Sequence, residues 1–257
     1  MKIVVCIKHV PDTEAKIKVG ADGKNPDLAG VKMIVSPYDE FALEEALLMK
    51  DRDAATEIVA VGAGDDGVQG SLRQALAMGA DRAIHVSDAS LATADALTRA
   101  RALAAAIREE APDVVFTGKT GVGDDEGQVG AMLGELLDRP HAGAVDELTL
   151  DGKRFNAHRA IEGAVEIVEG DLPAVIAWDK GQHQPRYPSL RGIMAAKKKP
   201  LAVKTAADLG LTLAGSLVVR EALELPPARP PGRLLTGDVG EAANTLARLL
   251  REEAKVI

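Results

Sequence analysis

The sequence predicts a doubly wound α/β fold, in which helices cover both faces of a mostly parallel, Rossmann-like sheet. Two observations carry this prediction. Short runs rich in Val and Ile alternate with longer segments of helical periodicity, and a length of 257 residues is common for α/β folds that form one domain. The predicted strands are residues 2–7, 57–61, 83–86, 113–117 and 172–178.

Amphipathic helices are predicted between these strands. Apolar residues share one helical face around residues 41–49, and they recur at steps of three and four around residues 97–107. Ser36 is a candidate N-cap for the first of these helices, and Pro37 suits its first turn. Gly79 follows residues 75–78 and predicts the end of another helix.

After Pro140 the pattern changes to short alternating segments. Residues 147–150, 154–158 and 165–168 predict a small antiparallel side sheet, with turns at Asp151-Gly152 and near Gly163. Residues 179–188 are polar and rich in turn formers, and they follow the carboxyl end of the strand at 172–178. A loop is expected there.

The C-terminal part of the chain reads as an arm. The proline-rich run from Leu225 through Pro230 to Gly232 can form neither a helix interior nor a sheet interior, so it predicts a stiff extended tether. A helix is expected from about 239 to 253. We therefore divide the chain into an α/β domain, residues 1–224, and a C-terminal arm for a partner subunit, residues 225–257.

Composition excludes several classes of function. The formal charge of −8 and the absence of a long basic run argue against nucleic-acid binding. Cys6 is the only cysteine, which excludes an internal disulfide and a cysteine-cluster metal site and fits a reducing, cytoplasmic compartment. The apolar run at the amino terminus is too short for a signal peptide or a membrane span, and no membrane insertion is expected.

The segment from Thr117 to Gly130 is the strongest candidate for a ligand site. It is rich in glycine, follows a predicted buried strand and leads into a helix, where backbone amides can approach a phosphate. The spacing of its glycines matches neither of the phosphate-binding motifs G-x-x-x-x-G-K-[ST] and G-x-G-x-x-G. The acidic residues 124–126 disfavour a triphosphate that has no metal ion. An ordinary strand-to-helix turn explains the pattern equally well.

A second candidate segment covers residues 179–199. Leu190, Ile193 and Met194 recur at helical steps after Ser189, and a basic run follows them. A surface helix that packs its apolar side inward is the simpler interpretation. The alternative is a protruding helix that docks a partner protein.

No catalytic arrangement stands out. The five histidines are scattered without the spacing of metal ligands, and no nucleophile elbow occurs. Lys8, His9 and Asp12 follow the first strand and are candidates for ligand contact at the edge of the sheet. Asp12 is equally suited to a turn after Pro11.

Five stretches of the sequence resemble the β subunits of electron transfer flavoproteins. They are IVVCIKHVPDTEAKIKV, SPYDEFALEEAL, ALAMGADRAIHV, GKTGVGDDEGQVGAML and LPAVIAWDKGQHQPRYPSLRGIMAAKKKPL. The resemblance implies an adenine nucleotide alpha hydrolase-like fold and an electron carrier subunit that is not itself an enzyme. It also implies a heterodimer, in which the α subunit holds most of the FAD and this chain holds AMP in a structural role.

The resemblance also implies which residues contact the nucleotide. By matching position they are Cys6, Ser36, Pro37, Tyr38, Asp39, Ala63, Gly121, Val122, Gly123, Asp124, Asp125, Glu126, Gly127, Gln128, Val129, Gly130, Ala131 and Met132. These segments fall at the ends of predicted strands, where loops of a doubly wound sheet converge on one crevice.

Partner docking is the other implied function. Leu190 matches the leucine that anchors members of the family to acyl-CoA dehydrogenases, and Ile193 and Met194 belong to the same helix. The basic residues that follow this helix in the family match Lys197, Lys198 and Lys199. Electrons would pass through FAD to a membrane quinone oxidoreductase. Glu166 matches an acidic residue linked to interdomain electron transfer.

Two alternatives remain open at this point. An electron-bifurcating flavoprotein would hold FAD in place of AMP, although Asp124 stands where such members tend to have glycine. An ATP-dependent adenylating enzyme would need a triphosphate loop after the first strand, where this chain has Lys8 to Asp12.

Overall fold

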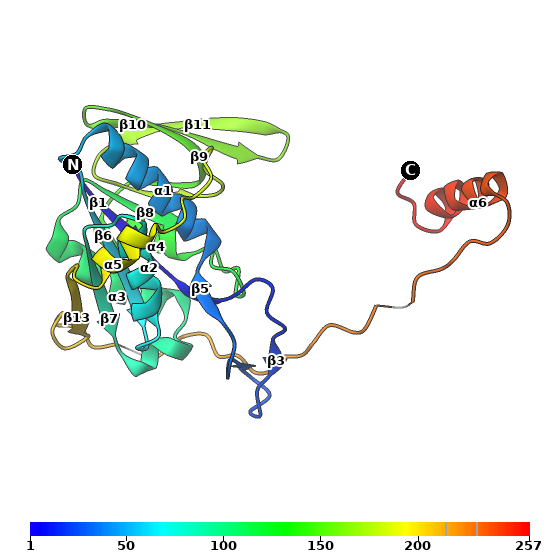
Figure 1. Ribbon diagram of the computed structural model, residues 1–257, viewed down its shortest axis with the longest axis horizontal. Coiled ribbons are helices and arrows are strands. Elements are labelled where there is room, and N and C mark those ends of the chain that lie inside the picture. The colour runs from blue at the N-terminus through cyan, green and yellow to red at the C-terminus, as the bar shows by residue number, and fades with distance from the viewer. Residues whose placement is uncertain (214, 230) are drawn as a thin grey trace.

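A nine-stranded sheet forms the centre of the molecule, which confirms the predicted α/β fold (Figure 1). The computed structural model of the chain describes residues 1–213, 215–229 and 231–257. Across the sheet the strands are β11 (Ala164–Asp171), β10 (Arg154–Ile161), β9 (His141–Asp151), β12 (Ala174–Trp178), β8 (Val114–Gly118), β1 (Lys2–Cys6), β6 (Glu57–Gly64), β7 (Arg82–Ser87) and β13 (Leu201–Thr205).

The strand order reverses in the middle of the sheet. The chain begins at β1, moves outward through β6 and β7, and returns on the other side of β1 through β8 and β12. These strands are all parallel to their neighbours. Where connections diverge in this way, the carboxyl ends of the strands leave a crevice that suits a ligand. In this chain that point lies between β1 and β8.

Helices cover both faces of the sheet. α1 (Pro37–Arg52) and α2 (Val68–Met78) pack on one face, and α3 (Ala96–Glu110) and α4 (Val129–Leu137) pack on the other. Successive residues of β1 alternate between the two layers, because side chains of a strand point to opposite faces: Ile3 joins the core beneath α1 and Val4 the core beneath α3.

The predicted side sheet is an extension of the main sheet. β9, β10 and β11 pair antiparallel as predicted, but β9 also pairs parallel with β12 over Val175–His141 and Ile176–Ala142. The predicted antiparallel strands are therefore confirmed, and the structure adds that they continue the main sheet. The reason is local: β9 starts at His141, well before the predicted start at residue 147, and its first residues are those that reach β12.

Several short elements were not predicted. β2 (His9–Pro11) pairs with β5 (Met33–Val35), and β3 (Lys18–Val19) pairs with β4 (Pro26–Asp27). The 3-10 helix η1 (Ala89–Thr93) precedes α3. The helix predicted after Ser189 is α5 (Leu190–Ala196), which leads to the edge strand β13.

α1 begins where the sequence predicts, but the expected cap is absent. Ser36 takes the N-cap position and Pro37 follows, yet the Ser36 hydroxyl is buried and has no hydrogen-bond partner. The N–H of Asp39, which a capping hydroxyl can accept, donates instead to the Ser36 carbonyl (2.9 Å). The Gly79 prediction is confirmed, since α2 ends at Met78 and Gly79 has φ +147°.

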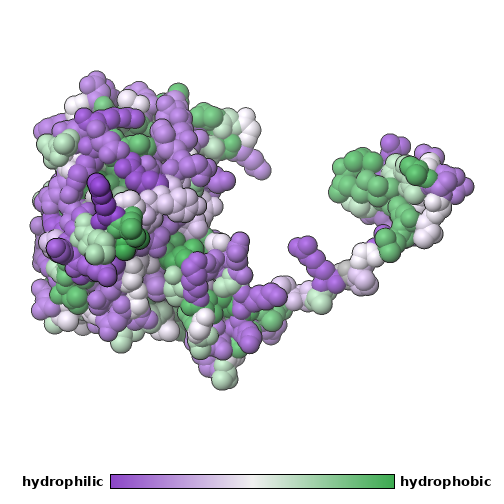
Figure 2. Space-filling view, viewed as in Figure 1, coloured by the Kyte–Doolittle hydropathy of each residue, from purple (hydrophilic) through white to green (hydrophobic). Residues whose placement is uncertain are grey.

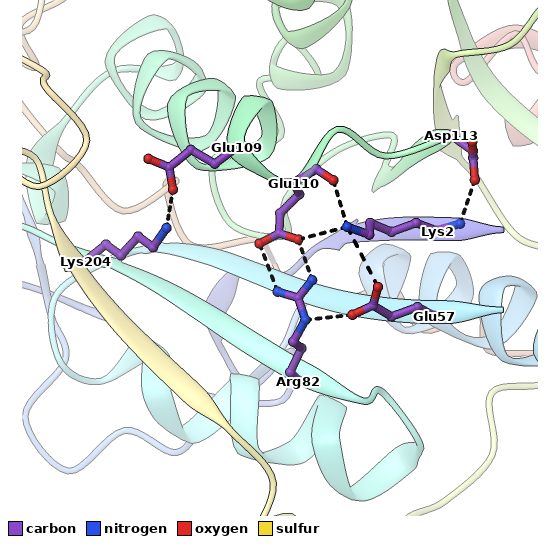
Figure 3. A network of polar contacts seen from close by, with 7 residues as sticks. All are labelled: Lys2, Glu57, Arg82, Glu109, Glu110, Asp113 and Lys204. Atoms are coloured by element: carbon purple, nitrogen blue, oxygen red, sulfur yellow. Dashed lines mark hydrogen bonds and ion pairs between the residues drawn. The ribbon is translucent and has the colours of Figure 1, made fainter. Parts of the chain in front are cut away.

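An ion-pair network joins the amino-terminal ends of the central strands (Figure 3). The Arg82 guanidinium donates to Glu57 (2.7 Å) and forms a bidentate pair with Glu110, and the Lys2 ammonium donates to the Glu110 carbonyl (2.9 Å). The network joins β1, β6 and β7 to the end of α3. It lies at the opposite end of the strands from the crevice, so its role is structural.

The C-terminal arm extends away from the sheet (Figure 1). Residues 225–229 and 231–238 form neither helix nor strand, and Pro230 of the predicted tether lies outside the described residues. α6 (Val239–Glu252) has no buried residue. Figure 2 shows hydrophobic residues gathered on this helix and on the tail that follows it. Val239, the first residue of α6, is 88% exposed. None of the helices in the described ranges is both long and apolar enough to cross a membrane.

Candidate functional site

A crevice opens at the carboxyl ends of β1, β6 and β8, where the strand order reverses. The space within and in front of the crevice amounts to about 650 Å³, part of which is open to solvent. Its lining is Cys6, Ile7, Lys8, Asp39, Ala63, Arg99, Leu103, Thr117, Gly118, Lys119, Thr120, Gly121, Asp124, Glu126, Gly127, Gln128 and Val129.

Asp39 ties the two central strands together beneath this crevice. Its carboxylate accepts the backbone N–H of Lys8 (2.7 Å) and of Gly118 (2.8 Å), so it bridges the ends of β1 and β8 from the first turn of α1. Burial raises the pKa of Asp39 to about 7, against the opposing effect of the two N–H donors. The bridge keeps the floor of the crevice at a fixed width.

Two cations meet at Asp124. The Lys8 ammonium and the Arg99 guanidinium (3.3 Å) both bind its carboxylate, one from the end of β1 and the other from α3. Lys119 pairs with Asp179 (2.7 Å) and lies 5.4 Å from the centre of the Tyr38 ring. With Glu126 also present, the positive charge of the lining is largely balanced. Such a site suits an anion of low charge better than a polyphosphate.

The loop between β8 and α4 brings its backbone close to the crevice. Gly123 and Gly127 have positive φ, a conformation that glycine adopts without steric cost. A Cβ on Gly121 would overlap the end of the Lys8 side chain. Gln128 is the N-cap residue of the nine-residue helix α4, and its side chain makes no capping hydrogen bond. The first backbone amides of α4 therefore have no acceptor from a capping side chain.

Three buried polar atoms of the lining have no hydrogen-bond partner among the described residues. They are Thr117 Oγ1, Thr120 Oγ1 and Asp124 Oδ1. A buried hydroxyl without a hydrogen bond costs free energy, and buried polar groups in proteins are usually satisfied. A ligand with several hydrogen-bonding groups, such as a nucleotide, fits this lining.

About half of the predicted nucleotide residues line the crevice. Those that do are Cys6, Asp39, Ala63, Gly121, Asp124, Glu126, Gly127, Gln128 and Val129. The others, which lie nearby along the same segments without lining it, are Ser36, Pro37, Tyr38, Val122, Gly123, Asp125, Gly130, Ala131 and Met132.

The structure adds residues that the sequence did not identify. Arg99 and Leu103 reach the crevice from α3, and Lys8 was predicted only as a candidate. Arg99 and Leu103 lie four residues apart on one helix, and this spacing alone is only a weak sequence signal of a ligand site. Burial, followed by the charge of Asp39, raises the pKa of the Cys6 thiol, so this thiol stays protonated and unreactive.

α5 turns its larger apolar residues outward. Leu190 is 80% exposed, Met194 61% and Ile193 45%. The simpler interpretation, in which this apolar side packs inward, was wrong, because α5 contacts the body of the protein through its small residues, as described below. The Ser189 hydroxyl accepts the N–H of Gly192 (3.0 Å), which confirms the helix start.

The basic run after α5 divides into two parts. Lys197 and Lys198 are exposed, whereas Lys199 is partly buried. The Lys199 ammonium donates to the carbonyls of Leu76 (2.9 Å) and Ala80 (2.7 Å), and burial lowers its pKa. The Lys199 side chain therefore makes its hydrogen bonds within the protein.

The remaining polar candidates lie apart from the crevice. His9 hydrogen-bonds the Ser71 hydroxyl (2.8 Å), and Asp12 pairs with Lys32 (2.8 Å) and accepts the N–H of Glu14, as expected of a turn residue. Glu166 pairs with Arg159 on the neighbouring strand (3.1 Å). Within the described ranges, no cluster of three or more possible metal ligands is found.

The fold and the crevice together define a doubly wound α/β protein with a ligand site at the reversal of its strand order. Residues 27–209 match the family model of the electron transfer flavoprotein domain.

Full-length relatives agree with this match. The chain is 40% identical over 256 residues to "Electron transfer flavoprotein subunit beta" of Syntrophomonas wolfei subsp. wolfei, which covers 100% of this chain and 98% of that protein. It is 38% identical over 260 residues to the protein of the same name from Bacillus subtilis, with 100% of both chains covered, and 36% identical over 261 residues to that of Sus scrofa, with 100% and 99% covered. The chain belongs to the electron transfer flavoprotein family, as a β subunit. Membership implies a flavin in the assembled complex and an α subunit as partner.

Proposed function

We propose that the crevice binds AMP as a structural ligand of a heterodimeric electron carrier. The observation that carries this proposal is the lining itself: a glycine-containing loop, the Lys8–Asp124–Arg99 cluster and unpartnered threonine hydroxyls meet at the end of β1 and β8. Lys8 and Arg99 would bind the phosphate, and amides of the first turn of α4 would donate to it.

The balance of charge in the lining favours a monophosphate. Lys8 and Arg99 share the single carboxylate of Asp124, which leaves positive charge for one phosphate group, and each further phosphate group would add negative charge beside Asp124 and Glu126. This argues against an ATP-dependent adenylating enzyme, and the chain is proposed to act as a carrier subunit in the cytoplasm.

FAD, held mainly by the α subunit, would supply the redox chemistry of the complex. This chain would provide the scaffold, one wall of the flavin site and the docking of electron donors. We propose that the arm, residues 225–257, contacts the α subunit, because α6 presents apolar residues that nothing else in the described chain covers.

The nucleotide proposal is tested by co-purifying the chain with its α subunit, denaturing the complex and identifying the released nucleotides. One flavin and one AMP per heterodimer are expected. Two flavins and no AMP would instead indicate the bifurcating alternative, with FAD in this crevice. Release of one flavin without AMP, or of no nucleotide, would refute the proposal.

We further propose that α5 docks acyl-CoA dehydrogenases, with Leu190 as the anchor and Ile193 and Met194 beside it. An exposed leucine on a short protruding helix can fill a partner's pocket, and Lys197 and Lys198 can steer it toward an acidic surface. The electrons would then leave to a membrane quinone oxidoreductase.

Leu190→Ala tests this docking role in the assembled heterodimer. Burying a leucine side chain contributes about 1.5–3 kcal/mol, so kcat/KM for a reduced acyl-CoA dehydrogenase should fall by about tenfold or more, while the bound flavin is retained. Leu28→Ala removes another exposed leucine, outside α5, and is the matched control. Unchanged transfer in Leu190→Ala would contradict the proposal.

A further inference from the structure

α5 lies against the C-terminal half of α2 and contacts it through two small residues, Gly192 and Ala196 (Figure 1). Gly192 faces the Ala77 carbonyl so closely that a Cβ would overlap that oxygen, and Ala196, four residues later, is buried. The larger apolar residues Leu190, Ile193 and Met194 are exposed on the rest of the helix surface. α5 is therefore attached on one side and free on the other.

Two cations fasten the ends of α2 and α5 to each other. The Arg73 guanidinium, from α2, donates to the carbonyls of Ala196 (2.6 Å) and Lys199 (2.8 Å) at the end of α5. In return, the Lys199 ammonium donates to Leu76 and Ala80 at the end of α2. Each cation thus meets the free carbonyls and the negative end of the other helix's dipole.

The chain before α5 is also fixed. The Arg186 guanidinium binds the buried Glu44 carboxylate of α1 through Nε (2.9 Å) and Nη2 (2.9 Å), and it also binds Asp51 (2.8 Å). With the Ser189 cap, the segment is held at its start and at its end. A seven-residue helix is not stable in water by itself, so these contacts decide whether α5 is formed.

We propose that Arg73 is a positioning residue for partner docking: by capping the end of α5 it keeps this helix formed before a partner arrives. The inference rests on the proposed docking role of Leu190. If α5 were formed only part of the time, the apparent affinity for the partner would be the intrinsic affinity multiplied by the fraction of time for which the helix is formed, since only the formed helix presents Leu190. Arg73 is partly buried beneath α5 and acts through that helix.

The test uses the assembled heterodimer and an acyl-CoA dehydrogenase reduced by its substrate. Arg73→Gln is expected to raise KM for the dehydrogenase by about tenfold, the effect of losing charged hydrogen bonds of this kind, with kcat changed by less than about twofold. Arg73→Lys, which keeps the charge, should recover part of the loss. Amide hydrogen exchange of residues 193–196 should become about tenfold faster in Arg73→Gln.

A double variant separates positioning from general destabilisation. Leu190→Ala combined with Arg73→Gln should have the same KM as Leu190→Ala alone, because a helix without its anchor gains little from being formed. Arg101→Gln, which removes an exposed arginine of α3, is the matched control and should change neither KM nor exchange. Lys199→Gln removes the reciprocal bonds and should repeat the Arg73→Gln pattern, which keeps the test valid where Arg73→Gln assembles poorly.

Three results would overturn the inference. They are an unchanged KM in Arg73→Gln and Lys199→Gln while Leu190→Ala raises it, unchanged exchange at residues 193–196, and effects of Leu190→Ala and Arg73→Gln that multiply. In each of them the docking role of Leu190 itself survives. A Leu190→Ala variant with normal transfer would instead refute the docking proposal on which this inference rests.

Discussion

Asp39 should make the stability of this chain depend on pH, and replacing it with asparagine should remove that dependence. Burial raises the pKa of Asp39 from its ordinary value of 3.8 to about 7. The folded state therefore holds the proton over a pH range in which the unfolded state has released it. The resulting stabilisation is fully present below pH 3.8 and is lost as the pH rises through about 7.

The size of the effect follows from this shift. With one pKa unit equal to about 1.4 kcal/mol, protonated Asp39 stabilises the fold by about 2–3 kcal/mol at pH 5 and by almost nothing at pH 8. Asp39→Asn has no titrating group at this position. The stability of the original chain relative to the variant should thus rise by about 2–3 kcal/mol when the pH is lowered from about 8 to about 5.

The measurement is urea unfolding at both pH values, followed by the fluorescence of Trp178. This tryptophan is the only one in the chain, is buried, and pairs in register with Gly118, which donates to Asp39. Asparagine can accept only one of the two N–H groups at a time, so a constant loss of about 1–3 kcal/mol is also expected. A difference between the two chains that does not change with pH would refute the reasoning, since Asp39 would then be ionised throughout.

Three further predictions concern the crevice, the amino-terminal ends of the strands and the start of α3. In thermal unfolding, Gly118→Ala should destabilise the chain by about 1–3 kcal/mol, because its Cβ would lie 2.6 Å from Asp39 Oδ1, whereas Gly121→Ala should cost little, because only a flexible lysine end must move. Glu110→Gln should destabilise the chain at pH 7, and calorimetry should find this difference shrinking below about pH 4.5, because the pair with Arg82 lowers the Glu110 pKa and its stabilisation is lost on acidification. Asp95→Ala should cost about 1 kcal/mol as a lost cap of α3 and should speed amide exchange at residues 217–218, whose N–H groups Asp95 accepts; unchanged exchange there would contradict this.

The central strands and helices were predictable because their signals are local. β1, β6, β8 and β12 each contain a run of buried apolar residues, chiefly Val, Ile and Ala, and α3 shows clear periodicity. β13 was missed because its five residues, LAVKT, form a short and largely exposed edge strand with no clear alternation of buried and exposed residues. The pairing of β9 with β12 was also missed, since pairing between distant strands leaves no mark on either segment.

The candidate site was predictable where it depends on glycine and strand ends. The loop from Gly121 to Gln128 could be identified because only a few residue types form a turn that approaches a ligand. The contribution of Arg99 could not, because an arginine near the start of a helix is usually a solvated residue. The internal role of Lys199 was equally hidden, because its partners are backbone carbonyls, which every residue has.

Because α6 lies away from the body of the chain, the subunit is vulnerable before it assembles with its partner. A helix of 14 residues, none of them buried, is only marginally stable in water, so a newly made chain would carry residues 239–252 largely unfolded. Proteases cleave such segments readily, and the exposed Val239 and Leu246 would promote aggregation. Production of this subunit without its companion should therefore yield a truncated domain that ends near Leu225, and co-translation with the companion should preserve the full chain.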